Sequence, residues 1–524
     1  MKKICLALCG SLGWTGLVSA QVMPPPPAES PVPPAALAAP QPQRVSLKDF
    51  VARLTSSDES LRVQRLEQAI GDAGLRGAEA VFEPFAFTSL ERESMHVLNS
   101  AADAKQRGVN PGDVYDSQEN RFKAGVMVKV DSGADLEFSY NASVIKNSLQ
   151  ALANAPSPEN KGYLGLKVTQ PLMRGYGGEV NRLGIRIADA DRRVAGETVR
   201  QLTAQRVMES INQYLLVQRA EERVRLRIQA RQVATVVDKE ISLQHAGGLR
   251  SAAELTEAHA SLALKNAQLA QAQQDLEEQI NALQVFLSAR DRTSGETLQR
   301  SLVLPEPVQA ALTPAEEEQA QPRQGLNAVL VLRPEARIST LRVEREARKV
   351  DFAVDQARPE LNMTLRYGKE DLSSANRALP AYLGGQVPYN SWMVGLTLKV
   401  GLFGDQKKSS DYDVAIHRRS QAQLAASAIQ QRIANELHAS QTVFDKAHQQ
   451  MERQREIVQA QRSLLKIEEQ LVREGRRSAI DVARKQQELL TAEETLVDVQ
   501  TQATRASYLV AQTSGSLLSQ LDLE

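Results

Sequence analysis

The sequence predicts an α+β membrane protein with an internal two-fold repeat, in which β-strands lead into very long helical hairpins. Three observations support this prediction. The same order of motifs occurs twice along the 524 residues. Long stretches rich in Ala, Gln, Glu, Arg and Leu have the composition of extended helices. The chain also begins with an export signal, and no later segment is apolar enough for a transmembrane helix.

Residues 1–20 have the pattern of a secretory signal peptide: two lysines, a short apolar run and a small-residue cleavage site at Val18-Ser19-Ala20. A signal anchor is the alternative, but the run is short and broken by glycines. Both cysteines, Cys5 and Cys9, lie in this segment. A cleaved chain therefore has no cysteine, which excludes disulfides, thiol catalysis and thiolate metal sites. No lipid anchor is expected, because a large residue precedes Cys9.

Residues 21–45 are predicted to be a proline-rich disordered tether, with nine prolines between Met23 and Gln43. Beyond it, no stretch approaches the roughly 18 apolar residues of a transmembrane helix. If the mature chain enters a membrane, it is therefore expected to do so as β-strands.

The two repeats are expected over residues 46–290 and 326–524, with a polar, proline-punctuated connector over 291–325. In each repeat a helix ends at a proline, Pro84 or Pro359, and alternating polar and apolar residues follow. Proline disfavours helix in the residue before it, so each proline is predicted to mark a helix-to-strand boundary.

Each repeat then has a returning strand, Tyr163–Val168 or Trp392–Leu398, that ends in a glycine-containing turn. A proline-free helix follows, from about Asn181 to Ala246 or from about Lys407 to Glu474. At 1.5 Å per residue each helix is roughly 100 Å long.

Both long helices end in nearly the same motif, Gly248-Leu-Arg-Ser251 and Gly475-Arg-Arg-Ser478. A glycine in the left-handed conformation ends a helix, and a serine followed three residues later by an acid begins one. Here those acids are Glu254 and Asp481. Each repeat is therefore predicted to contain a tight helical hairpin, whose second helix runs to about Ala289 or Ser514.

The strands alternate as a wall with one lipid-facing and one lumen-facing side does. Four strands are too few to close a barrel and an open edge cannot face lipid, so three copies sharing about twelve strands are expected. The alternative is a soluble sheet packed on helices. Two further alternating segments, Phe122–Val130 and Leu136–Val144, flank a turn at Asp131-Ser-Gly133. They are expected to form an accessory hairpin outside the membrane, or else to add two strands per subunit to the barrel.

The long helices carry a narrow apolar stripe, for example Val207, Ile211 and Leu215, among many Ala, Gln and Arg residues. A stripe this narrow favours helix-on-helix packing in a coiled-coil wall with water on its other side.

The duplicated order, the turn Gln170-Pro-Leu-Met-Arg-Gly-Tyr-Gly177 and the two hairpin motifs resemble the TolC outer-membrane efflux protein family, from Ser46 to the C-terminus. The resemblance implies a homotrimer in the outer membrane, with a shared twelve-stranded transmembrane β-barrel surrounded by outer-membrane lipid. It also implies a long α-helical coiled-coil barrel across the periplasm and a mixed equatorial region. The expected role is a passive exit duct of a tripartite efflux or secretion system, with a periplasmic adaptor protein and an inner-membrane transporter as partners.

The resemblance also assigns roles to the hairpin tips, which dock the adaptor and narrow the pore in members of the family. A well-studied member has a second acid one helical turn after the first, where this chain has Arg484. In place of a double acidic ring, Arg484 is expected to pair with Asp481 and clasp the entrance; the alternative is that these charges belong to a solvated hairpin tip. The implied adaptor-docking residues are Gly248, Leu249, Arg250, Ser251, Gly475, Arg476, Arg477 and Ser478, and the implied pore constriction comprises Glu254, Asp481 and Arg484.

Other functions find little support in the sequence. Lys+Arg and Asp+Glu balance at 63 each, so there is no basic surplus for a nucleic-acid partner. The histidines have no metal-ligand spacing, and Gly175-Tyr-Gly-Gly178 lacks the Lys-Ser/Thr pair of a phosphate loop. No enzyme activity and no cofactor are expected. The competing hypothesis is a non-channel periplasmic coiled-coil scaffold or adaptor protein.

Overall fold

The computed structural model describes residues 43–152, 157–285, 303–305, 325–373, 379–387, 389–401, 405–474 and 476–523. All of them lie in one compact unit, Pro42–Glu524. The predicted signal peptide, most of the tether and most of the connector lie outside the described residues. Across the described ranges, no helix is both long enough and apolar enough to cross a membrane.

Six strands form one antiparallel sheet in the order β2-β3-β4-β5-β7-β8. β2 and β8 are its edges, and every neighbouring pair is antiparallel. The strands are β2 (Phe85–Leu98), β3 (Val114–Lys129), β4 (Asp135–Asn147), β5 (Glu159–Pro171), β7 (Glu360–Ser373) and β8 (Tyr389–Lys399).

The two additional segments are β3 and β4, and both lie in the middle of the sheet; which of the two expected arrangements they adopt relative to a membrane stays a prediction. β3 pairs with β2 from Phe85↔Met127 to Leu98↔Val114, and β4 pairs with β5 over most of its length. Both alternating segments are strands, as predicted, but alternation alone does not identify which strand lies beside which.

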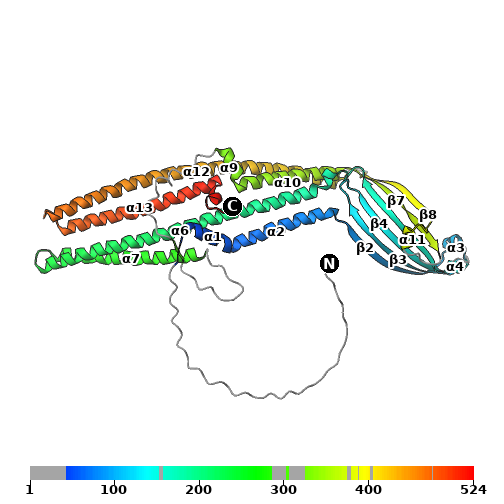
Figure 1. Cartoon of the computed structure of the whole chain (residues 1–524), viewed down its shortest axis with the longest axis horizontal. Helices are drawn as coiled ribbons and strands as arrows, with labels where there is room; N and C mark the ends of the chain where they lie inside the picture. Colours follow the sequence, from blue (N-terminus) through cyan, green and yellow to red (C-terminus); the bar gives the residue numbers. More distant parts are fainter. Residues whose placement is uncertain are drawn as a thin grey trace, which may run out of the picture. The chain divides into compact units, whose positions relative to one another are not determined.

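The helices form two long hairpins with further helices packed along them (Figure 1). α2 packs on α6, α10 packs on both α6 and α12, and α6 also contacts α13. The helices with their bounds are α1 (Leu47–Ser57), α2 (Glu59–Glu79), α3 (Ala101–Arg107), α4 (Ser148–Leu152), α5 (Gly178–Asn181), α6 (Leu183–Ala246), α7 (Ala252–Val285), α9 (Leu326–Leu332), α10 (Pro334–Ala357), α11 (Leu379–Leu383), α12 (Gln406–Arg473), α13 (Ala479–Ser514) and α14 (Leu517–Gln520), with a 3-10 turn at Ala80–Phe82.

The predicted long hairpins are confirmed. α6 is 64 residues long and α12 is 68, and each ends within two residues of the predicted position. The predicted apolar stripe is buried as well: Val207 and Ile211 are inaccessible to solvent, and Leu215 is nearly so. Between β5 and α5 lies a turn in which Gly175 and Gly177 have positive φ, the left-handed region that glycine adopts without strain.

The main hydrophobic core joins the ends of several elements around the middle of α6. Phe50 and Val51 of α1, Ile211 and Tyr214 of α6, and Leu517 of α14 pack together there. Next to this core is a two-stranded parallel sheet of β1 (Gln43–Val45) and β6 (Val303–Pro305). Gln43–Val45, the last three residues of the predicted tether, thus form a strand.

Candidate functional site

The first hairpin tip is a short, well-bonded turn between α6 and α7. Gly248 has φ +75°, the left-handed conformation that glycine adopts without strain. The Gly248 amide donates to the His245 carbonyl at 2.9 Å, and the Leu249 amide donates to the Gln244 carbonyl at 2.8 Å. These bonds satisfy the last carbonyls of α6 and reverse the chain within a few residues.

α7 then begins with the predicted reciprocal cap. The Ser251 amide donates to the Glu254 carboxylate at 2.9 Å, and the Glu254 amide donates to Ser251 Oγ at 3.3 Å. Arg250 donates to the same carboxylate at 2.7 Å. The backbone hydrogen bond from Ser251, and then the Arg250 guanidinium, lower the pKa of Glu254 below its ordinary value of 4.5.

The second tip, between α12 and α13, is also capped by a serine and an acidic residue, with different side chains around them. Ser478 and Asp481 form a capping box, in which the Ser478 amide donates to the Asp481 carboxylate at 3.1 Å. Arg476 lies 3.6 Å from Glu474, and Arg477 lies 3.4 Å from Glu468. Gly475, the predicted helix stop, lies outside the described residues.

The expected ion pair between Asp481 and Arg484 is not formed within one copy of the chain. Among the described residues no salt bridge joins them, and Arg484 is exposed. The physical reason is that the Asp481 carboxylate turns back to accept the amide at the start of α13. A carboxylate committed to a cap is not oriented towards a side chain one turn further along the helix.

Both tips carry exposed side chains. Leu249 is 79% exposed at the apex of the first turn, and the Arg476 and Arg477 side chains are exposed at the second. The tip surface therefore combines one apolar residue with several positive charges, while the acids of the predicted constriction cap their own helices.

The two hairpins are joined by a ladder of charges that the sequence analysis missed. Arg223 contacts Asp498 at 2.9 Å, and Arg227 contacts Glu494 at 2.7 Å. Arg219 also approaches Asp498, at 3.8 Å. The arginines recur every four residues on α6 and the acids are four residues apart on α13, so each set lies on one helix face. This spacing was visible in the sequence, but the pairing of these two helices was not.

The sheet has two chemically different faces. One row of directly paired residues is apolar across all six strands and comprises Ala86, Val126, Phe138, Leu166, Tyr367 and Trp392. The adjacent row, which points to the opposite face, has Glu137, Lys167 and Arg366 on β4, β5 and β7 and Phe85, Met127 and Met393 on the others. Large apolar side chains on the first face, Trp392, Val394 and Leu396 among them, are exposed in the single chain. A sheet with one apolar and one polar face matches the pattern of a membrane wall.

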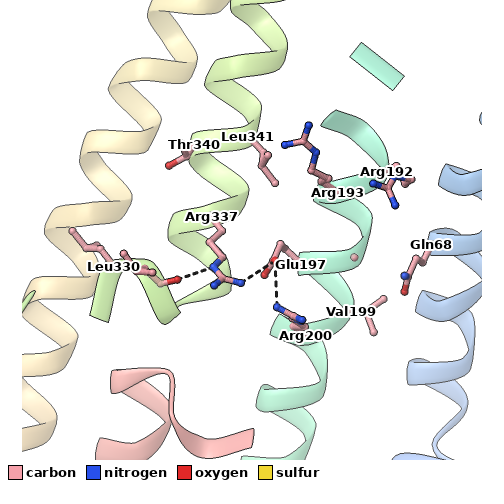
Figure 2. A pocket seen from close by; sticks show the side chains of 12 residues that line it. Gln68, Arg192, Arg193, Glu197, Val199, Arg200, Leu330, Arg337, Thr340 and Leu341 are labelled. Carbon is pink, nitrogen blue, oxygen red and sulfur yellow. Dashed lines mark hydrogen bonds and ion pairs between the residues drawn. The ribbon is translucent and has the colours of Figure 1, made fainter. Parts of the chain in front are cut away.

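A hollow of about 750 Å³ lies among α2, α6, α9 and α10 (Figure 2). Four arginines line it, which suggests an anion site at first sight. However, Figure 2 shows Glu197 between two of them, at 3.2 Å from Arg337 and 3.5 Å from Arg200. Arg192 and Arg193 are in turn paired with Asp189. With its positive charges already paired in this way, the hollow offers little to a ligand.

In the part of the chain that the structure describes, no group of three or more His, Cys, Asp or Glu side chains is placed to hold a metal ion. Several histidines instead make local contacts; His259, for example, lies 2.6 Å from Asp238 on the facing helix of its hairpin.

Comparisons with known proteins agree with this description. Residues 325–516 match the family model of outer membrane efflux proteins. A comparison with curated proteins gave no match. Among solved structures, the outer-membrane channel OprN is similar at TM-score 0.62 and 15% identity, over 95% of this chain and 99% of that one.

Two further solved structures are similar. The Campylobacter jejuni CmeC outer membrane channel has TM-score 0.62 and 15% identity, over 90% of this chain and 86% of that one. The outer membrane protein VceC of Vibrio cholerae has TM-score 0.60 and 16% identity, over 90% and 96% respectively. The predicted resemblance is therefore confirmed. The chain shares the fold of these outer-membrane channels.

Proposed function

We propose that this chain, whose residues 325–516 match the outer membrane efflux protein family and whose fold is that of outer-membrane channels, is one subunit of a homotrimeric exit duct. Three copies share one transmembrane β-barrel in outer-membrane lipid, and their helical hairpins form a tube across the periplasm. Transport is passive, and an inner-membrane transporter supplies the energy through a periplasmic adaptor protein.

The observation that carries this proposal is the pairing of a two-faced sheet with two very long hairpins in one chain. The sheet exposes an apolar face that water does not favour, and its edge strands β2 and β8 have no neighbouring strand among the described residues. Lipid can cover the apolar face, and the edge strands of further copies can pair with β2 and β8. The helices provide length rather than a wide core, since their buried stripe is narrow.

We further propose that the tips dock the adaptor and gate the pore. The exposed Leu249 and the arginines of the second tip, Arg476 and Arg477, are the docking residues, together with Gly248, Arg250, Ser251, Gly475 and Ser478 around the turns. Glu254, Asp481 and Arg484 line the constriction. Since Asp481 does not pair with Arg484 in the same copy, an ion-paired clasp requires the Arg484 of one copy to meet an acid of the next.

The test is single-channel conductance of the purified, detergent-extracted protein in a planar bilayer, with its oligomeric mass measured in parallel. A trimer with small, steady openings supports the duct. Arg484→Ala should enlarge the openings, and Asp481→Asn should do so while leaving an acceptor for the cap. Arg505→Ala is the matched control, because Arg505 is exposed on the same helix, 21 residues further from the tip.

Two results would count against this function. A monomer that is extracted by salt alone and never inserts would indicate the competing role, a periplasmic coiled-coil scaffold or adaptor. A conducting trimer whose openings are unchanged by both tip substitutions would retain the duct and remove the ion-paired gate.

A further inference from the structure

We propose that the hairpin β3–β4 adds two strands per copy to the transmembrane wall, so that three copies close a barrel of eighteen strands. Six strands from each of three copies replace the four per copy expected from the sequence. The inference rests on the proposed function for the number of copies. The contribution of each copy rests on the pairing, faces and anchoring of β3 and β4.

The hydrogen-bonded ladder is continuous through both strands. β3 pairs with β2 over 14 residue pairs, β3 with β4 over 13, and β4 with β5 over 11. No pairing joins β2 directly to β5, so β3 and β4 are the only connection between β2 and the rest of this described sheet. An accessory hairpin would leave β2 and β5 as neighbours, because an open edge inside lipid is not tolerated.

The inserted strands carry the same two faces as the strands around them. Val126 and Phe138 lie in the apolar row that contains Leu166 and Trp392, and they are 46% and 48% exposed in the single chain. The neighbouring row shows the same continuity: Val128, Leu136, Val168, Leu365 and Val394 are all apolar and directly paired. The apolar surface thus continues across β3 and β4 without a polar gap, which a hairpin in water would not require.

The opposite face of β3 and β4 is polar and internally paired. Lys123 of β3 contacts Glu137 of β4 at 2.7 Å, and Arg121 contacts Glu93 of β2 at 2.8 Å. The residues on this face of β4 include Ser139, Asn141 and Ser143. Such side chains suit the water-filled lumen of a barrel.

The turn between β3 and β4 is locked onto the turn that leads from β5 into α6. The Gly177 amide donates to the Ser132 carbonyl at 3.1 Å, and Gln170 Nε2 donates to the same carbonyl at 3.1 Å. Arg182 pairs with Asp131. Gly133 has φ +89°, and a Cβ there would lie 2.1 Å from the Gly175 carbonyl oxygen. The hairpin is therefore held at the end of the sheet where the strand-to-helix turn lies.

Closure with further copies is compatible with the strand directions. Five successive antiparallel pairings make β8 run opposite to β2. The β8 strand of one copy can therefore lie antiparallel beside the β2 strand of the next, as an all-antiparallel barrel requires. Because each copy has an even number of strands, this antiparallel pairing between copies is possible for any number of copies.

The width of the barrel follows from its strand number. For strands about 4.8 Å apart and tilted by about 40°, twelve strands give a backbone diameter of about 24 Å and eighteen give about 36 Å. Barrels of 16–18 strands leave an open aqueous channel, according to the general relation of size to strand number. The outer end of this duct is therefore predicted to be about half as wide again as a twelve-stranded wall.

The first test places β3 and β4 relative to the membrane. The only cysteines of the sequence are Cys5 and Cys9, so a single cysteine introduced into the processed protein is unique. In protein reconstituted in lipid vesicles, Val126→Cys should resist a charged, water-soluble maleimide, and a bimane attached there should be quenched by brominated lipid. Ser143→Cys, on the polar face of β4, should react with the maleimide and escape the quenching. Equal reaction of both positions with the water-soluble reagent would place the hairpin outside the membrane and overturn the inference.

The second test counts strands. Native mass of the detergent complex should give three copies, and electron cryomicroscopy in nanodiscs should show a wall about 36 Å across. A conducting trimer with a wall about 24 Å across would overturn the eighteen strands and leave the proposed function intact. A dimer with that narrower wall would overturn both the eighteen strands and the proposed homotrimer. Failure to insert at all would refute the channel itself.

Discussion

The Arg333→Met substitution probes the junction at which three helices of the described chain meet. Arg333 is the residue before α10, and its side chain is 7% exposed. Its guanidinium donates to Glu335 at 3.0 Å, to Glu436 of α12 at 2.9 Å and to the Thr513 carbonyl of α13 at 3.2 Å. Methionine fills much of the same volume, so the substitution mainly removes these donors.

The expected cost is about 2–3 kcal/mol. A hydrogen bond to a charged group is worth about 1.5–3 kcal/mol, and removing one partner of a buried pair costs about 3–5 kcal/mol. The range for a single hydrogen bond to a charged group applies here, because Glu436 remains 41% exposed and water can solvate its carboxylate when the arginine is gone. The matched control is Arg432→Met, which removes the other arginine near Glu436. That side chain is 57% exposed at 3.5 Å, so its loss should cost about 0–0.5 kcal/mol.

The assay is amide hydrogen exchange of the purified protein, followed by mass spectrometry over the first turns of α10 and the last turns of α13. Since 1.4 kcal/mol is tenfold in an equilibrium constant, Arg333→Met should speed exchange there about 30- to 140-fold. Arg432→Met should change it by no more than about two- to threefold. Equal, small effects of the two substitutions would refute the reasoning that burial, and not the mere presence of an ion pair, determines the contribution of these arginines.

Three further predictions concern the turn, the tip and the charge ladder. Gly133→Ala should lower the free energy of unfolding in urea titrations by at least about 2 kcal/mol, because the new Cβ meets a carbonyl oxygen. The control is Gly112→Ala, which also has positive φ but lies in open space and should cost about 1 kcal/mol. Similar costs for the two substitutions would show that the close contact at Gly133 contributes nothing. The pKa of Glu254 is lowered by the cap amide and then by Arg250, so the ionised carboxylate stabilises the tip turn above pH 4.5 and this stabilisation is lost as the pH falls below that value. A spin label on the turn should therefore gain mobility below pH 4.5. Glu254→Gln should abolish this pH dependence. A double-mutant cycle with Arg227→Ala and Glu494→Ala should give a coupling of about 1 kcal/mol, and strict additivity would show that this contact contributes nothing.

The features that the sequence predicted well are those encoded by neighbouring residues. The ends of the long helices follow from a glycine at the first tip and from a serine with an acid three residues later at both, and these caps are local hydrogen bonds. Strand alternation and the burial of Val207 and Ile211 are likewise properties of a short window. The tip residues were named from the same local motifs, and their roles in docking and gating remain predictions.

The contacts between distant segments were determined only by the tertiary structure. Period-two alternation identifies β3 and β4 as strands but is equally compatible with a separate hairpin, so only the ladder from β2 to β5 assigns them to the main sheet. The Asp481 carboxylate had two possible partners at helical spacing, and the geometry of the cap selected the backbone amide over Arg484. The junction at Arg333 joins segments about 100 and 180 residues apart in the sequence, which no local pattern can reveal. Local chemistry therefore determined the elements of this protein, and long-range packing determined how many strands the chain contributes to its sheet.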